Sequence, residues 1–341
     1  MRLKETLTYD DVLLVPQHSN IESRSEIDIS NCLDNNITLQ LPIISAPMDT
    51  VTETEMAIAL RQAGGLGVIH RYNSIEEQVS LVRDACTEGM CSVGAAVGVT
   101  GDFEERACAL YDAGANVVCI DVAHGHHALV ESAIKKLKST FGNVIHIMAG
   151  NVATLEGFNA LSDWGADSIR CNIGGGSICS TRIQTGHGVP GLHTILECAK
   201  TDRNTKIIAD GGIRNSGDIC KALAAGADFV MLGSMLGGTT ESPGAIIQDL
   251  GGNEYKVYRG MASKEAQHNW RGKFSSNEGI STTVPFRGHV EDILDDLANG
   301  IRSGLSYSGS RSIVEFQSRA RFIKQTSAGL TESNTHILGK H

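Results

Sequence analysis

The sequence has little that would hold a nucleic acid or a membrane. Its 29 Lys and Arg residues are outnumbered by 39 Asp and Glu residues, the net charge is -10 and the isoelectric point is near 5.6. The basic residues form no stripe of the kind that binds a phosphate backbone. The longest apolar runs fall far short of the roughly 20 residues that span a bilayer. The first residues also lack the apolar core of a signal peptide. We therefore expect no nucleic-acid or membrane partner, and we predict a soluble, cytoplasmic protein.

Paired cysteines and the common nucleotide and metal motifs are also missing. The nine cysteines are an odd number without a C-x-x-C pair, and several lie in apolar runs, where a free cysteine packs as a small hydrophobe. We therefore expect no disulfide framework. No G-x-G-x-x-G joins a strand to a helix, as a dinucleotide fingerprint would. The histidines of "HGHH", from His124 to His127, lack a partner at zinc-site spacing, which makes metal binding there the weaker interpretation.

What the chain does contain is a regular alternation of elements. Eight short apolar runs of strand type begin at Pro42, Leu66, Ser92, Asn116, Val144, Asp167, Lys206 and Asp228. Most are separated by segments of helical period, and a glycine often stands where such a segment ends. Parallel strands buried on both faces read as continuous apolar runs. The pattern predicts an α/β fold, a (β/α)8 TIM barrel, in preference to a doubly wound open sheet.

We predict a single domain over residues 1–341, with an N-terminal extension at 1–40 and a C-terminal flap and tail at 254–341. In such a barrel, functional groups gather in the loops after the strands. The loops after the seventh and eighth runs, "DGGI" and "LGS", offer backbone amides beside a hydroxyl, which is typical of a phosphate cradle. The alternative is that these glycines only turn the chain. Asp210 would then face a ribose hydroxyl, because a phosphate would repel its carboxylate.

One cysteine stands apart from the others. Cys179 follows Gly-Gly-Gly-Ser-Ile after the sixth run, in the segment "GGGSICST". A thiolate on such a loop is exposed and movable, and neighbouring amides help to stabilise it. Cys179 is therefore a candidate nucleophile, and a loop cysteine without a chemical role is the alternative.

Several segments together carry a resemblance to a known family. "YDDVLLVPQHS", "LPIISAPMDTVTE", "IDVAHGHH", "AGNVAT", "GSICSTRIQTGHGVP", "ADGGIR", "MLGS" and "YRGM" resemble, in this order, the IMP dehydrogenases and GMP reductases. The resemblance covers nearly the whole chain. It implies a homotetrameric (β/α)8 barrel in which the loop cysteine attacks C2 of a purine 5′-monophosphate. A hydride then passes between that carbon and a nicotinamide cofactor.

The resemblance also implies roles for individual residues. Cys179 matches the nucleophile, Thr181 the hydroxyl that helps to activate water or the leaving ammonia, and Glu278 the acid/base glutamate. The matching substrate-binding positions are Ser45, Met48, Asn151, Ser177, Asp210, Gly212, Gly233, Ser234, Tyr258, Gly260 and Met261. The cofactor-binding positions are Asp121, Ala123 and His124, and the carbonyls of Gly174, Gly176 and Cys179 would hold a potassium ion.

The branch of the family is less sharply indicated. Dehydrogenases usually carry regulatory domains after the second strand, for which this chain has no room, and a long flap with an Arg-Tyr pair. The segment from Met261 to Gly288 is short and offers "NWRGKF" instead. This favours NADPH-dependent reduction of GMP to IMP and ammonia.

Other features resemble the dehydrogenases. These are "PMDT", Arg71 in place of a lysine, and the tail from Ser327 to His336, which is similar to a potassium-binding segment. An IMP dehydrogenase that uses NAD and lacks the regulatory domains remains an alternative, as does a non-catalytic nucleotide-binding protein. "RCNIGGGS" also departs from the "KVGIGPGS" of both branches, and Gly175 in place of proline is expected to loosen the cysteine loop.

Overall fold

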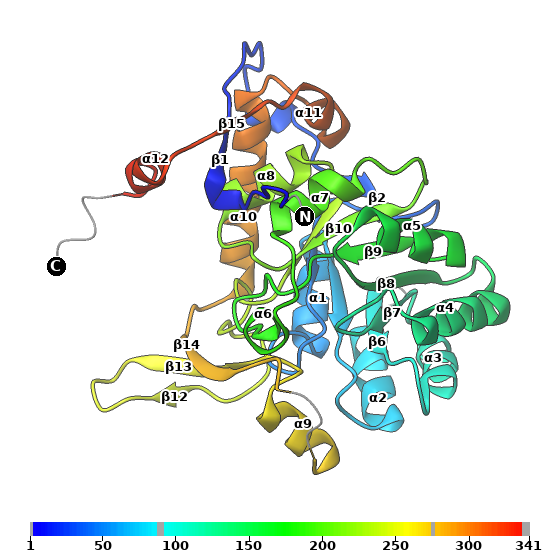
Figure 1. Cartoon of the computed structure of the whole chain (residues 1–341). Helices are drawn as coiled ribbons and strands as arrows, with labels where there is room; N and C mark the ends of the chain where they lie inside the picture. The colour runs from blue at the N-terminus through cyan, green and yellow to red at the C-terminus, as the bar shows by residue number, and fades with distance from the viewer. Residues whose placement is uncertain (1–2, 87–91, 274–276, 336–341) are drawn as a thin grey trace.

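The fold is built around a closed barrel of eight parallel strands (Figure 1). The computed structural model describes residues 3–86, 92–273 and 277–335. The barrel strands are β4 (Ile43–Ser45), β5 (Leu66–Ile69), β6 (Val93–Val97), β7 (Val117–Asp121), β8 (His146–Val152), β9 (Ser168–Cys171), β10 (Lys206–Asp210) and β11 (Phe229–Leu232). The last strand pairs with the first, with Val230 opposite Ile43. All eight apolar runs form strands, and this closure confirms the TIM barrel over an open sheet.

Helices follow the strands and surround the barrel in Figure 1. They are α1 (Thr54–Gln62), α2 (Ile75–Ala85), α3 (Phe103–Asp112), α4 (Ala128–Phe141), α5 (Leu155–Trp164), α6 (Thr181–Thr185), α7 (Gly191–Cys198), α8 (Ser216–Ala224) and α10 (Val290–Tyr307). Several begin at a side chain that accepts a backbone N–H of the first turn, as Ser74, Thr154 and Asn215 do. These caps satisfy donors that a helix cannot bond internally.

A short hairpin closes one end of the barrel. Its strands, β2 (Asn31–Cys32) and β3 (Thr38–Leu39), pair antiparallel. Leu33, Ile37 and Leu39 from this hairpin join the apolar side chains inside the barrel, among them Phe229 and Met231. Asp34 lies 2.8 Å from Nδ1 of His146, the first residue of β8, so the hairpin covers the amino ends of the strands. The carboxyl ends are left for the functional loops.

An excursion separates β11 from its helix α10. It contains β12 (Ile247–Gln248), β13 (Glu254–Arg259), α9 (Lys264–Arg271) and β14 (Ser281–Pro285), and the three strands form an antiparallel sheet. This sheet projects from the barrel in Figure 1. The segment from residue 254 onward therefore contains the eighth barrel helix as well as the flap.

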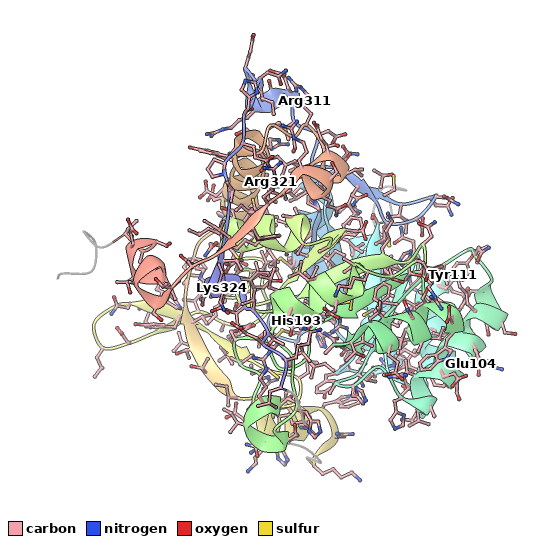
Figure 2. All side chains as sticks on the ribbon, turned by 45° about the horizontal axis from the view of Figure 1, so that its top comes forward. Glu104, Tyr111, His193, Arg311, Arg321 and Lys324 are labelled. Atoms are coloured by element: carbon pink, nitrogen blue, oxygen red, sulfur yellow. The ribbon has the colours of Figure 1, made fainter. Side chains whose placement is uncertain are left out.

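Elements near the two ends of the chain lie together on one side of the molecule. η1 (Tyr9–Asp11) and β1 (Val12–Leu14) precede η2 (Arg24–Glu26), while α11 (Ile313–Arg319), β15 (Phe322–Lys324) and α12 (Ser327–Glu332) follow α10. β1 pairs with β15. Figure 2 shows Arg311, Arg321 and Lys324 on this side, whereas Glu104 and Tyr111 of α3 lie on the other.

The helices and cysteines of the described residues bear on the expectations about membranes and disulfides. None of their helices combines the length and the apolar character needed to cross a bilayer. Seven of their cysteines are free, among them Cys179. Cys86, at the end of α2, differs from our expectation because it is disulfide-bonded. The remaining cysteine, Cys91, lies outside the described residues.

The contact between α1 and β5 allows no side chain at Gly67. A β-carbon there would lie 2.5 Å from the Cα atom of Ala57 in α1. We predict that Gly67→Ala lowers the free energy of unfolding by about 1–3 kcal/mol, since overpacking displaces backbone. Denaturant unfolding measures this. Gly329→Ala, in α12, is the control and should change stability less, because its β-carbon would meet only side-chain atoms of Gln325 and Thr326, the nearest 3.3 Å away. Equal stability of both variants would contradict the packing argument.

Candidate active site

The loop that carries Cys179 begins where β9 ends. It turns tightly, with Gly174 at φ +81°, and the Cys179 amide donates to the Gly176 carbonyl at 3.1 Å. Cys179 comes just before the short helix α6, and its side chain is partly buried. The loop therefore presents the thiol at the carboxyl end of the barrel, as the sequence predicts.

The thiol is the first member of a short hydrogen-bonded chain. Cys179 Sγ donates to Thr181 Oγ1 at 3.1 Å, and the Thr181 hydroxyl donates to Glu278 Oε2 at 2.8 Å. The three predicted catalytic residues are thus in contact. In each bond the donor lies on the Cys179 side and the acceptor on the Glu278 side. A proton can therefore pass from the thiol, through the hydroxyl, to the carboxylate.

Glu278 is 97 residues away from Thr181 in the sequence. Backbone pairing between two distant segments brings it to this position. The Ser180 amide donates to the Glu278 carbonyl at 2.9 Å, and the Ile280 amide donates to the Ile178 carbonyl at 3.1 Å. Cys179 and Gly279 form an isolated antiparallel bridge. The returning flap is therefore joined to the cysteine loop as a short piece of sheet.

A cavity of about 220 Å³ opens beside Cys179. Its wall includes nine of the eleven predicted substrate-binding residues: Met48, Ser177, Asp210, Gly212, Gly233, Ser234, Tyr258, Gly260 and Met261. Cys179 and Glu278 belong to the same wall. The predicted phosphate loops, the predicted ribose carboxylate and the thiol therefore face one space.

Ser45 and Asn151 are placed differently. Ser45 is fully buried in β4, and its hydroxyl accepts a hydrogen bond from Thr52 at 2.8 Å, so it supports the strand rather than lining the cavity. Asn151 donates to Asp210 Oδ2 at 2.8 Å and to the Asn172 carbonyl at 3.0 Å. Asn151 therefore orients the Asp210 carboxylate without lining the cavity of about 220 Å³.

Tyr258 reaches the cavity because its neighbour is a glycine. A β-carbon on Gly233 would lie 3.0 Å from the Tyr258 hydroxyl. Burial raises the pKa of Tyr258, and hydrogen bonds from Ser177 and Ser234 lower it in part. The hydroxyl thus remains protonated at neutral pH beside two further hydroxyls. Such a set of neutral donors suits an anionic group.

β13 is attached to the barrel by an ion pair. Arg259 Nη2 lies 2.6 Å from Asp49 Oδ2, in the loop after β4. The Asp49 amide in turn donates to Met261 Sδ at 3.4 Å. This contact holds Tyr258 and Met261 against the cavity.

A second cavity, of about 360 Å³, adjoins the first and shares Cys179, Asp210 and Glu278 with it. Its wall contains the predicted cofactor residues Asp121 and Ala123, together with Thr181. His124 is not part of this wall. Partial burial lowers the pKa of His124, and repulsion from His126, His127 and His187 lowers it further. His124 is therefore neutral at neutral pH.

Tyr72 and Arg71 line this second cavity, and of the two the sequence analysis had singled out only Arg71. Tyr72, after β5, stacks on Trp270 of α9 with ring centroids 4.2 Å apart and planes at 13°. The Arg71 guanidinium lies 5.5 Å from the Tyr72 ring and 5.6 Å from the Trp270 ring, within cation–π range. The Tyr72–Trp270 stack joins the flap helix to a barrel loop. No local sequence motif predicts this contact.

Arg170 is a second residue that the sequence did not single out. It is buried in β9, with Nε 3.0 Å from Asp210 Oδ2 and Nη1 2.8 Å from Asp121 Oδ1. The sequence did contain a signal for this residue, which is an arginine inside an apolar strand run. A charge buried in a strand needs charged or polar partners, so such a position indicates an ion pair.

The structure gives a steric reason for the presence of glycine at position 175. Asn172 is buried at φ +148° and donates from Nδ2 to the Gly211 carbonyl at 3.2 Å. A β-carbon on Gly175 would lie 2.2 Å from that same Nδ2 atom. A side chain at position 175 would therefore displace the Asn172 amide, which ties the cysteine loop to the Asp210 loop.

The predicted potassium ligands are backbone carbonyls of the cysteine loop. The Gly176 carbonyl accepts the Cys179 amide, which leaves it one further lone pair. α12, in the predicted potassium-binding tail, packs beside η1, and its described residues are absent from the walls of both cavities. The tail's last residue, His336, lies outside the described residues. No cluster of His, Cys, Asp and Glu suited to a metal occurs in the described parts of the chain.

Comparisons with known proteins identify the family of this chain. A family model described as "IMP dehydrogenase / GMP reductase domain" matches residues 6–336. The inosine-5′-monophosphate dehydrogenase of Nitrosopumilus maritimus is 36% identical over 98% of this chain and 99% of its own, and the GMP reductase of Leishmania major is 34% identical over 99% and 98%. The crystal structure of a cysteine-to-alanine variant of Trypanosoma brucei GMP reductase, in complex with guanosine 5′-monophosphate, superposes with a TM-score of 0.93, at 32% identity and covering 98% of each chain.

The aligned span with the Nitrosopumilus relative is 473 residues, longer than this chain's 341, so the relative contains segments without a counterpart here. The family model covers nearly all of the described residues, including both cavities and the Cys179–Thr181–Glu278 chain. The protein therefore belongs to the IMP dehydrogenase and GMP reductase family.

Proposed function

We propose that this protein catalyses the reductive deamination of a purine nucleotide, GMP + NADPH + 2 H⁺ → IMP + NH₄⁺ + NADP⁺. The observation that supports this most is the position of the Cys179–Thr181–Glu278 chain where the two cavities meet. A nucleophile shared by two adjoining spaces can meet a nucleotide from one side and a hydride donor from the other.

In this proposal the nucleotide occupies the cavity of about 220 Å³. Its phosphate lies at Ser177, Gly212 and Ser234, where hydroxyls and backbone amides converge. Asp210 accepts from the ribose hydroxyls. The base then extends toward Cys179, whose sulfur bonds to C2.

The Cys179–Thr181–Glu278 chain supplies the proton transfers. Glu278 takes the thiol proton through Thr181 as sulfur adds to C2. It returns the proton to the departing amine, which leaves as ammonia, and a thioimidate remains on Cys179. After hydride has reached C2, the thiolate leaves and IMP is released.

The cavity of about 360 Å³ suits a nicotinamide cofactor. Asp121 and Ala123 line it, and Arg71 has a buried Nε atom without a hydrogen-bond partner. Arg71 and Arg271 add positive charge for the phosphate groups of NADPH. When bound, the cofactor supplies the hydride. His124, outside the wall, is proposed to contact the more distant part of the cofactor.

The short flap supports reduction over dehydrogenation. A dehydrogenase must hydrolyse its thioimidate, which requires a base and an opening for water. The segment from Met261 to Gly288 carries no Arg-Tyr pair, and α9 is held on Tyr72 by Trp270. The second candidate is an IMP dehydrogenase that uses NAD. Arg71 favours it, because an arginine does not release a proton as a lysine can.

We further propose a homotetramer in the cytoplasm, with no nucleic-acid or membrane partner. Ile246, Ile247 and Leu250, at the projecting sheet, are exposed apolar side chains of the kind that subunit contacts cover. The carbonyls of Gly174, Gly176 and Cys179 would hold potassium, with the tail from Ser327 to His336 supplied by the same or a neighbouring subunit.

The direction of the reaction is predicted from the flap. Steady-state turnover of GMP with NADPH should clearly exceed that of IMP with NAD, measured by absorbance of the reduced nicotinamide. A clear excess of the second reaction, with XMP as product, would make the protein a dehydrogenase. Absence of both activities, with nucleotide still bound, would indicate the non-catalytic alternative.

Replacing the carboxylate of Glu278 should remove the proton relay. Glu278→Gln is expected to lower kcat by about 10²–10⁴, the range for general acid–base catalysis, and to leave GMP affinity nearly unchanged. Stopped-assay kinetics and calorimetric titration measure the two quantities. Glu265→Gln, an exposed residue of α9, serves as the control and should retain activity. An unchanged kcat for Glu278→Gln would remove Glu278 from the mechanism.

Cys179 should be the cysteine whose alkylation responds to nucleotide. Burial raises the pKa of Cys119 to about 11 and that of Cys220 to about 12, so both stay protonated and unreactive at pH 8. We expect iodoacetamide to modify Cys179 and the exposed Cys32, and GMP to slow modification of Cys179 alone by at least about tenfold. Peptide mass spectrometry distinguishes the sites. Equal protection of Cys32, or none at Cys179, would contradict the assignment.

A further inference from the structure

Four charged side chains form a row across the carboxyl end of the barrel. In spatial order they are Arg71, Asp121, Arg170 and Asp210, from the loop after β5 and from β7, β9 and β10, and their charges alternate. Arg71 donates from Nη2 to the Asp121 carbonyl at 3.1 Å, and its Nε lies 3.7 Å from Asp121 Oδ2. Arg170 then bridges Asp121 and Asp210 at 2.8 and 3.0 Å. We call these residues the charge row.

Arg170 is the member on which the others depend. Its side chain is 8% exposed, and those of Asp121 and Asp210 are 16% and 15% exposed. Burial acts to lower the pKa of Arg170, but Cys119, Asp210 and Asp121 together hold it well above its ordinary value. Arg170 therefore remains a cation between the two carboxylates. Moving either carboxylate alone would leave a buried charge poorly compensated.

The two carboxylates that Arg170 bridges face different ligands. Asp210 lines both cavities, whereas Asp121 lines only the cavity of about 360 Å³. Asp210 has one further tie, because Asn151 donates to the same Oδ2 atom that Arg170 contacts. The guanidinium is thus the direct link between the nucleotide-side carboxylate and the cofactor-side carboxylate.

We propose that Arg170 is a positioning residue that couples the binding of the purine nucleotide to the binding of the nicotinamide cofactor. The inference rests on the proposed placement of the two ligands. A ligand that hydrogen-bonds to Asp210 holds that carboxylate in place and fixes the guanidinium. Asp121 is then already oriented for the second ligand, which loses less freedom on binding. Such coupling is reciprocal, so the cofactor tightens nucleotide binding by the same factor.

The planar fork of arginine is essential to this role. It offers Nε to one carboxylate and Nη1 to the other in fixed relative directions, whereas a lysine ammonium is a single point of charge. Arg170→Lys therefore preserves the buried charge, and with it the fold, but cannot hold both carboxylates at once.

The experiment measures GMP affinity by calorimetry without and with saturating NADP⁺, a pair between which no hydride can pass because the cofactor is already oxidised. All proteins compared in these titrations, the otherwise unaltered one included, carry Cys179→Ala as well, so that GMP cannot form the covalent adduct or lose ammonia during the titration. In the unaltered protein we expect NADP⁺ to tighten GMP binding at least about fivefold, within the usual range of such couplings. In Arg170→Lys the ratio should fall to about one, while each ligand alone binds within about threefold of its original affinity. A residue with only a structural role would weaken both single-ligand affinities instead.

Arg106→Lys is the matched control. Arg106 is the other buried arginine among the described residues and lies outside both cavities, so this variant should keep the coupling and the activity. A ratio near one in the unaltered protein overturns the proposal without any variant. A ratio that persists in Arg170→Lys overturns it as well.

The failure of the proposed function would look different. If the enzyme oxidises IMP, the same coupling is measured with IMP and NADH, which also cannot react, and the same loss in Arg170→Lys is expected. If purine nucleotide and cofactor do not bind with either pair, both proposals fail.

Discussion

The site depends on the backbone pairing between the cysteine loop and the end of the flap. The Ser180 amide on the Glu278 carbonyl and the Ile280 amide on the Ile178 carbonyl hold together two segments that are almost 100 residues apart in the sequence. These bonds place the Glu278 carboxylate on the Thr181 hydroxyl. Without them, the thiol would have a hydroxyl neighbour but no group to receive its proton.

The barrel makes this pairing possible because it leaves one end free. The β2–β3 hairpin fills the amino ends of the strands with apolar side chains, and the carboxyl ends open into the two cavities. The excursion between β11 and α10 returns over this open end. Its attachments are the Arg259–Asp49 ion pair on one side and the Tyr72–Trp270 stack on the other. The flap therefore contributes residues to the walls of both cavities.

Sequence reasoning succeeded where the signal is local. Each barrel strand was a continuous apolar run, since a strand covered on both faces has no polar side. The glycines around Cys179 indicated a movable loop. The position of Asp210, between a buried strand and two glycines, indicated a carboxylate at the end of that strand. The family resemblance placed Thr181 and Glu278, which local patterns could not have joined. Ser45 and His124 also came from the resemblance, and the structure puts them behind one cavity wall and outside the other.

The sequence by itself determined the barrel and the loop that carries Cys179. Periodicity and composition are properties of neighbouring residues, and these features need no more. Only the tertiary structure decided that Arg170 bridges Asp121 and Asp210, that Trp270 stacks on Tyr72, and that the Asn172 side chain occupies the space beside Gly175. The first two of these contacts join residues from different strands or loops. Their relative positions follow from strand register and barrel closure, which bring distant parts of the chain to one end.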